Sequence, residues 1–210
     1  MSSARKLLVE GSATFALVFI GTGACVVDAA SGGRLGVVGV GLVWGAAVWV
    51  LAAVSGAHMN PAVTLATRLP ARVTGLHFLA QTMGAFAASL ALLAIFRERA
   101  GGLGTTVPAT GAAASFLLEF AMTFVLVLAV LRFPARFVPA AAGVIVGLAA
   151  IFAGPLTGAS MNPARSLAPA LVSGHPGGLW IYLLAPLLGG WAAARVPKPG
   201  SRQPPALMQK

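Results

Sequence analysis

Two short stretches of the chain repeat each other almost residue for residue: residues 56–64 read GAHMNPAVT, and residues 158–166 read GASMNPARS. Their shared centre is Asn60-Pro61-Ala62 in the first stretch and Asn162-Pro163-Ala164 in the second. An Asn side chain caps the start of a helix well, and a Pro at the first helical position loses no hydrogen bond. Each stretch therefore predicts a helix that begins at its proline.

The helices that follow are too short to cross a membrane. Apolar-rich residues continue for about nine positions, over 61–69 and 163–171, and Pro70 stops the first run. A helix of that length spans roughly 14 Å, about half of the hydrocarbon core of a bilayer. One such motif alone is typical of an ordinary helix start. Two copies in apolar surroundings indicate a pair of half-helices that enter a membrane without crossing it.

The composition of the chain excludes a water-soluble domain. Hydrophobic residues make up 58% of the 210 residues and charged residues 9%, and the mean hydropathy is +0.91. Apolar runs that approach the length of a membrane span predict transmembrane helices over residues 7–27, 36–54, 73–96, 112–131, 138–153 and 179–196. With the two half-helices, the predicted fold class is an all-α membrane protein with six transmembrane helices.

The net charge of +10 is spread over the segments between the predicted spans, which argues against a nucleic-acid partner. If six spans alternate, most basic residues fall on one side, and the positive-inside rule places that side and both termini in the cytoplasm. These residues are Arg5, Lys6, Arg68, Arg72, Arg132, Arg136, Arg195, Lys198, Arg202 and Lys210. We predict a multi-pass protein of the cell membrane, or of the inner membrane in a bacterium, with a disordered tail over 197–210.

The two halves of the chain carry matching acidic residues as well as matching motifs. Glu10 precedes Thr14-Phe15 with the same spacing with which Glu119 precedes Thr123-Phe124. Three predicted spans in each half invert the second repeat relative to the first, an arrangement that places binding sites near the bilayer midplane. We therefore expect one transmembrane channel domain over 1–196, built from inverted repeats over about 1–100 and 112–196.

The asparagines of the two motifs suit a passage for neutral solutes. Each capping Asn accepts from its own helix through its carbonyl oxygen, which leaves its NH2 group free to donate into a cavity. The amino ends of two opposed half-helices each carry about half a positive charge, and this disfavours cations and hydronium where the ends meet. Neutral hydrogen-bond acceptors such as water still pass. The motifs therefore predict a channel that excludes ions and protons.

Four further side chains are candidates for function. Arg165 places a cation near the amino end of the second half-helix, where the dipole opposes it, and this indicates a role at the outer approach. Glu10 and Glu119 lie within predicted spans, where a carboxylate is costly without donors, so we expect them to brace the motif loops. His58 is expected in the same brace. The sequence has no catalytic or metal-ligand spacing, so no cofactor, metal or enzyme activity is predicted.

At these residues the chain resembles the aquaporin, or major intrinsic protein, superfamily. The resemblance rests on residues 55–64, on residues 158–166 and on the pattern Gln81-x-x-Gly84-Ala85, and it covers nearly the whole chain. It implies a homotetramer with one pore in each subunit and an outer constriction made by four positions. Ungapped counting from the motifs puts these positions at Val40, Ala150, Ala159 and Arg165.

The small residues at these positions affect which solutes can pass. Strict water channels of the family usually carry an aromatic residue and a His where this chain has Val40 and Ala150, so the resemblance implies a wider and more apolar mouth. Such a mouth is similar to those of glycerol facilitators and plant nodulin-like intrinsic proteins. The prediction is a passive channel for water and small neutral solutes, including glycerol-like polyols, urea and metalloid hydroxides. The alternatives are a strict water channel, an ion-coupled secondary transporter, an intramembrane enzyme and a non-conducting junction protein.

Overall fold

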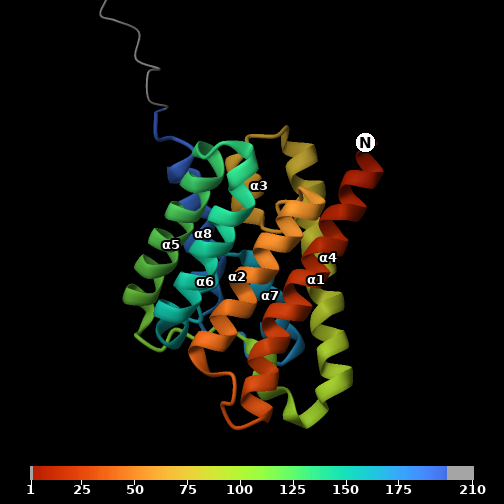
Figure 1. The fold of residues 1–210 in the computed structure, drawn as a ribbon, viewed down its shortest axis with the longest axis vertical. Coiled ribbons are helices and arrows are strands. Elements are labelled where there is room, and N and C mark those ends of the chain that lie inside the picture. Colours follow the sequence, from red (N-terminus) through yellow and green to blue (C-terminus); the bar gives the residue numbers. More distant parts are fainter. Residues whose placement is uncertain (1, 198–210) are drawn as a thin grey trace, which may run out of the picture.

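The chain folds as a bundle of helices (Figure 1) in a computed structural model that describes residues 2–197, apart from the side chains of residues 98–101. The first half contains α1 (Ser3–Ala30), α2 (Gly36–Ser55), α3 (Pro61–Ala66) and α4 (Ala71–Phe96). The 3-10 segment η1 (Arg97–Gly104) leads to the second half, which contains α5 (Ala112–Arg132), η2 (Ala135–Phe137), α6 (Val138–Thr157), α7 (Pro163–Val172) and α8 (Leu179–Ala193). The tail predicted over 197–210 lies, except for its first residue, outside the described residues.

Five segments of the described chain are long and apolar enough to cross a membrane: α1, α2, α4, α5 and the continuous segment Ala135–Thr157. The sixth predicted span is present as α8, an apolar helix of 15 residues. At 1.5 Å per residue it reaches roughly 22 Å, and Ala194 and Arg195 continue it as a turn. The all-α architecture with six long helices and two short ones is therefore the one that the sequence predicts.

The order of long and short helices is the same in both halves of the chain. In each half the short helix, α3 or α7, lies between the second and third long helices in sequence. Figure 1 shows α3 near the end of the bundle that carries the amino terminus, whereas α7 lies farther toward the other end. The described chain ends on the same side as it begins, and we call this side the terminal face. The two short helices thus enter the bundle from opposite ends.

The two halves meet where α2 packs against α6. Glycines spaced four apart face each other there, Gly41 and Gly45 from α2 and Gly143 and Gly147 from α6. A Cβ atom at Gly45 would lie 2.8 Å from the carbonyl oxygen of Gly143, and one at Gly143 would lie 2.6 Å from that of Gly45. Small residues at this spacing let two membrane helices bring their backbones together. The glycine crossing therefore sets the distance between the halves.

A second pair of glycines brings the buried glutamates close to their partner helices. A Cβ atom at Gly84 of α4 would collide with the carbonyl oxygen of Gly11, the residue after Glu10. In the same way, a Cβ atom at Gly189 of α8 would lie 2.5 Å from the carbonyl oxygen of Phe120, the residue after Glu119. These contacts hold α1 against α4 and α5 against α8 at equivalent places in the two halves.

The first half-helix is shorter than the sequence predicts. The first half-helix was expected to run to Leu69, but α3 ends at Ala66 and has only six residues. Thr67 caps it, and Arg68 takes a left-handed backbone with φ of 55°. A residue before proline is disfavoured in the helical conformation, and Pro70 is already the cap of α4, so the chain has to leave the helix early. The half-helix α7 runs to Val172, one residue beyond its predicted end.

Candidate functional site: two cavities beside paired half-helices

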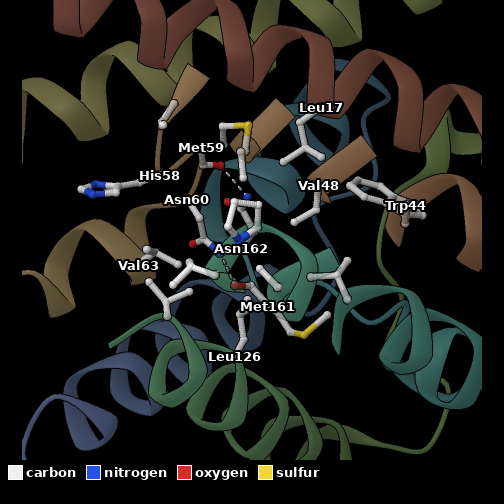
Figure 2. Close-up of a pocket in the computed structure, with 18 of the residues that line it drawn as sticks. Leu17, Trp44, Val48, His58, Met59, Asn60, Val63, Leu126, Met161 and Asn162 are labelled. Carbon is white, nitrogen blue, oxygen red and sulfur yellow. Dashed lines mark hydrogen bonds between the residues drawn. The ribbon is translucent and has the colours of Figure 1, made fainter. Parts of the chain in front are cut away.

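The two motif asparagines lie at the amino ends of α3 and α7 and reach across to each other's loops. Each carbonyl oxygen accepts from its own helix: Asn60 Oδ1 from the backbone N–H of Ala62 at 2.9 Å, and Asn162 Oδ1 from that of Ala164 at 3.1 Å. The amide groups donate across the site, Asn60 Nδ2 to the carbonyl of Met161 and Asn162 Nδ2 to that of Met59, both at 2.8 Å. Figure 2 shows these two hydrogen bonds as dashed lines.

The methionine before each asparagine supplies the accepting carbonyl from an unusual backbone conformation. Met59 has φ of 54° and Met161 has φ of 51°, a left-handed region that costs a residue with a side chain of order 1–3 kcal/mol. Both are held on two sides, because the N–H of each donates to a buried glutamate and the carbonyl of each accepts from the opposite asparagine. The strained turns thus lie where the two motifs are joined.

The glutamates hold the motif loops through several hydrogen bonds each. In the first half, Glu10 accepts from the backbone N–H groups of His58 at 2.8 Å and Met59 at 2.9 Å. It also accepts from the side-chain amide of Gln81 at 2.9 Å. That amide donates in addition to Thr64, whose hydroxyl lies 3.1 Å from Nδ1 of His58. The side chains of Glu10, Thr64 and Gln81 are buried, whereas that of His58 is 26% exposed.

The second half repeats this arrangement with different partners. Glu119 accepts from the backbone N–H groups of Ser160 at 2.8 Å and Met161 at 2.7 Å, and from the hydroxyl of Thr157 at 2.9 Å. Tyr182 on α8 donates from its hydroxyl to the carbonyl of Thr157, at 2.8 Å. The sequence pointed to both glutamates, whereas Thr157, Gln81 and Thr64 were not assigned to the brace.

A cavity of about 290 Å³ opens toward the terminal face, and we call it the inner cavity. Its polar groups come from Asn60, Asn162, Ser160 and His58, and most of its wall is aliphatic. Figure 2 shows Leu17, Val48, Val63 and Leu126 around the two asparagines. An apolar wall with a few converging donors is the usual composition of a site for a small neutral ligand.

A second cavity of about 360 Å³ lies toward the opposite end of the bundle, and we call it the outer cavity. Val40, Ala150 and Arg165 line it, together with Cys25, Asp28 and Thr105. Three of the four positions counted from the motifs therefore share one cavity. Ala159, the fourth, lines the inner cavity.

Arg165 is buried, with 3% of its surface exposed, and its guanidinium is held in place by neighbours from two other elements. Its Nη1 donates to the carbonyl of Gly104 in η1 at 2.9 Å, and its Cζ lies 4.9 Å from the ring centroid of Trp44 in α2. Among the described residues no carboxylate lies within 4.0 Å of this guanidinium. Within the described part of the chain, Arg165 is thus a buried cation without a carboxylate partner, and it borders the outer cavity.

Trp44 is the functional candidate that sequence reasoning missed. Its side chain lines both the inner and the outer cavity, so it lies at the place where the two approach each other. The ring packs onto α1 at Gly21, where a Cβ atom would lie 2.5 Å from a ring atom. Trp44 lies one helical turn from Val40. Counting from the motif selects a single position, and it does not tell which neighbouring side chain is large enough to reach the site. The Trp-Gly pair at 44–45 within a glycine-rich helix was the available signal.

Comparisons with known proteins agree with this geometry. A family model described as Major intrinsic protein matches residues 1–196. Aquaporin NIP1-4 of Oryza sativa subsp. japonica is 43% identical, over 90% of this chain and 74% of that protein. Nodulin-26 of Glycine max is 38% identical, over 91% of this chain and 76% of that protein.

The solved structure of the aquaglyceroporin from Plasmodium falciparum has the same fold, with a TM-score of 0.81 over 92% of this chain and 94% of that chain. The two sequences are 24% identical, so this likeness bears on the fold alone. The family match and the level of identity to the plant proteins bear on function as well. The chain therefore belongs to the major intrinsic protein family and is a channel for water and small neutral solutes, not an enzyme.

Proposed function

We propose that the inner and outer cavities are the two halves of one pore, which is joined past Trp44 and the asparagine pair. The observation that carries this proposal is the reciprocal hydrogen bonding of the motifs, in which each asparagine amide donates to the methionine carbonyl of the other loop. Because an amide has two N–H groups, one donor remains on each asparagine beside the inner cavity. Both remaining donors are available to the same file of solute.

The proposed mechanism of ion exclusion rests on fixed positive charge at two depths. The amino ends of α3 and α7 point toward the asparagine pair and disfavour cations there. With ten residues, α7 has the fuller helix dipole, and the six residues of α3 contribute less than a longer half-helix would. Arg165 adds a whole charge beside the outer cavity. A proton relay is disfavoured because a water that accepts from both asparagines has to orient its own hydrogens outward in both directions.

We propose a solute range of water, glycerol-like polyols, urea and undissociated metalloid hydroxides. Val40 and Ala150 present small apolar surfaces to the outer cavity, which Arg165 also lines. A solute with hydroxyl groups on one side and a hydrocarbon edge on the other matches such a wall. The names aquaporin and nodulin-26 of the relatives are compatible with this range without specifying it.

We further propose that the protein is a homotetramer of the cell membrane, with one pore in each subunit and both termini in the cytoplasm. The orientation is supported by seven basic residues whose positions at helix ends group them on the terminal face. They are Arg5, Lys6, Arg68, Arg72, Arg132, Arg136 and Arg195. An ion-coupled transporter would need an intramembrane acid that is free to titrate, and Glu10 and Glu119 are instead occupied in holding the loops.

Proteoliposomes test the pore directly. Vesicles that contain the purified protein are mixed rapidly with a hyperosmotic glycerol buffer, and light scattering follows first water efflux and then glycerol entry. The proposal expects both phases to be faster than in empty vesicles, with no added conductance for sodium or protons. If glycerol entered no faster than in empty vesicles while water efflux was still accelerated, the protein would be a strict water channel and the proposed solute range would be wrong.

A further inference from the structure

A hollow on the terminal face, away from both cavities, brings two arginines together beside a tryptophan. It is lined by Leu65, Arg68, Trp191, Ala194 and Arg195, and we call it the arginine hollow. Arg68 belongs to the turn after α3, and Arg195 to the turn after α8. The hollow is therefore made by the fold from two segments that are distant in sequence, and it shares no lining residue with the inner or the outer cavity.

Both guanidiniums are held in position, and most of their donors have no partner within the described part of the chain. Arg68 donates from Nη2 to the carbonyl of Ala194 at 2.5 Å. Arg195 stacks on Trp191, with its Cζ 3.3 Å from the ring centroid, and donates from Nη1 to the carbonyl of Trp191 at 3.2 Å. A guanidinium has five N–H donors in a planar fork that matches the oxygens of a phosphate. Two such forks, both exposed to solvent, face one hollow.

No carboxylate among the described side chains balances the positive charge of this region. A third arginine, Arg132, donates to the carbonyls of Val196 and Pro197, just beyond the same helix end. Among the described residues no carboxylate lies within 4.0 Å of any of the three guanidiniums. Glu10 and Glu119 are buried in the loop braces, and Asp28 accepts from backbone N–H groups at the opposite end of the bundle. An anionic ligand would supply the missing charge.

The surface next to the hollow is apolar and runs along one side of α8. Four large side chains of this helix are between 45% and 51% exposed, and their spacing of three or four residues places them on one helical face. They are Trp180, Leu184, Leu188 and Trp191. The face extends for roughly 16 Å at 1.5 Å per residue, with a tryptophan at either end, as is typical of a helix that faces lipid.

We propose that the arginine hollow is a binding site for the phosphate headgroup of an anionic phospholipid, whose acyl chain lies along the exposed face of α8. A free phosphate ion would use the two guanidiniums but not the apolar face, and a neutral lipid would use the face but not the charge. The combination of both in one place specifies a phospholipid with net negative charge, such as phosphatidylglycerol. Attraction between an anionic membrane surface and a nearby Lys or Arg is worth about five-fold in affinity for each residue, and basic pockets at the membrane interface bind such headgroups.

Native mass spectrometry of the full chain, titrated with phosphatidylglycerol or phosphatidylcholine in mixed micelles, tests this site. We expect phosphatidylglycerol to bind more tightly than phosphatidylcholine. The variant Arg195→Gln should weaken phosphatidylglycerol binding by about five-fold, and the double variant Arg68→Gln/Arg195→Gln by about 25-fold, with binding of phosphatidylcholine little changed. The single variant keeps the hydrogen bond from Arg68 to the end of α8, so it remains informative if the double variant does not fold.

The matched control is Arg72→Gln/Arg136→Gln, which removes the same charge from exposed positions of the terminal face outside the hollow. It should leave phosphatidylglycerol binding within about two-fold of the unmodified chain, because neither arginine lines the hollow. Equal losses in both double variants would overturn the proposal in favour of a diffuse basic surface. Competition by a millimolar excess of inorganic phosphate as effective as that by phosphatidylglycerol would also overturn it. The proposal would also be overturned if the double variant Arg68→Gln/Arg195→Gln changed the mass of the oligomer without changing the number of lipids bound to it.

Discussion

The guanidinium of Arg165 lies over the indole ring of Trp44, with its Cζ 4.9 Å from the ring centroid. Arg165 comes from α7 in the second half of the chain and Trp44 from α2 in the first, so the contact joins the halves beside the outer cavity. Because the ring of Trp44 also borders the inner cavity, the pair lies where the two cavities approach each other. The size of this ring therefore bears directly on what can pass.

Replacement of Trp44 by alanine should admit larger solutes. Removal of the indole takes away the bulkiest group between the cavities, so we expect the ratio of erythritol to water permeability to rise by roughly ten-fold, equivalent to a barrier lowered by about 1.4 kcal/mol. Trp44→Phe, which keeps an aromatic ring of smaller size, should give an intermediate ratio. Light scattering of proteoliposomes in erythritol and sucrose gradients gives both permeabilities.

The matched control for this change is Trp49→Ala, which removes an indole from the same helix at a side chain that is 52% exposed and borders neither cavity. It should leave the ratio at the value of the unmodified chain. An unchanged ratio in Trp44→Ala would mean that solutes cross without passing this ring, and the joined pore would have to be abandoned.

The fold could be read from the sequence because its determinants are local. The spacing of Asn60 and Pro61, and of their counterparts in the second half, encodes a helix start that needs no distant partner. Long apolar runs encode the spans in the same way. The early end of α3 was missed because neither Thr67 nor Arg68 forbids a helix, and only the backbone preference of Leu69 before Pro70 opposes it.

The outer part of the site was harder to predict because it depends on which residues of distant segments face each other. Counting from a motif selects Val40 on α2, but it does not reveal that Gly21 of α1 leaves room for the ring of Trp44 beside the same cavity, one turn away. In the same way, Ala159 was grouped with Val40 and lines the other cavity. Such contacts depend on how α2 packs against α1 and α6 at the glycines of these helices, and no short stretch of sequence determines this packing.

The double variant Val40→Phe/Ala150→His should narrow the outer cavity from two sides. Both residues line this cavity, and both changes add a ring where the chain has a small apolar side chain. We expect glycerol permeability to fall by roughly ten-fold or more, about 1.4 kcal/mol of added barrier, with water permeability reduced much less. Glycerol entry equal to that of the unmodified channel, in vesicles that hold the same amount of protein, would show that these two positions do not constrict the path.

The two braces should differ in their tolerance of an amide. Glu119→Gln turns one of two accepting oxygens into a donor that faces a buried N–H group of Ser160 or Met161, at a cost of about 1–3 kcal/mol. Glu10→Gln should be milder, because His58 lines the inner cavity with a side chain that is 26% exposed, so water can reach this loop. In addition, the buried Oε1 of Gln81 has no partner among the described residues and can accept from the new amide.

Thermal unfolding of the purified protein in detergent measures the difference between the braces. At roughly 2–4 °C for each kcal/mol in a chain of this size, Glu119→Gln should lower the Tm by several degrees more than Glu10→Gln does. Equal shifts would show that the extra acceptor of Gln81 and the exposure of His58 have no energetic consequence.

A single methyl group at the crossing of α2 and α6 should destabilise the bundle. In Gly143→Ala the new Cβ would lie 2.6 Å from both the carbonyl oxygen of Gly45 and the Cβ of Trp49, so the backbones have to separate. Overpacking of this kind costs about 1–3 kcal/mol. The control Gly75→Ala adds the same group within α4, where no atom lies within 4 Å of the new Cβ. Gly143→Ala should lower the Tm measurably, whereas Gly75→Ala should leave it unchanged or raise it slightly because alanine favours the helix.

A thiol reagent that enters the outer cavity should react with Cys25, the single cysteine of the chain. Its side chain is half-buried on α1 and lines the same cavity as Arg165 and Thr105. A mercuric ion or a methanethiosulfonate attached to this sulfur would occupy part of a cavity of about 360 Å³, so water and glycerol permeability should both fall after treatment. The loss should be larger with a bulky methanethiosulfonate than with the methyl derivative, because the block is steric, and reduction with excess thiol should restore the flux.

The variant Cys25→Ser separates this block from unspecific damage by the reagent. In the variant, permeability after treatment with the reagent should equal the permeability of untreated vesicles that contain the same variant. Inhibition that persists in Cys25→Ser would place the reactive group elsewhere. Mass spectrometry shows whether Cys25 is completely labelled. If it is and the flux does not change, the outer cavity lies off the path of the solute.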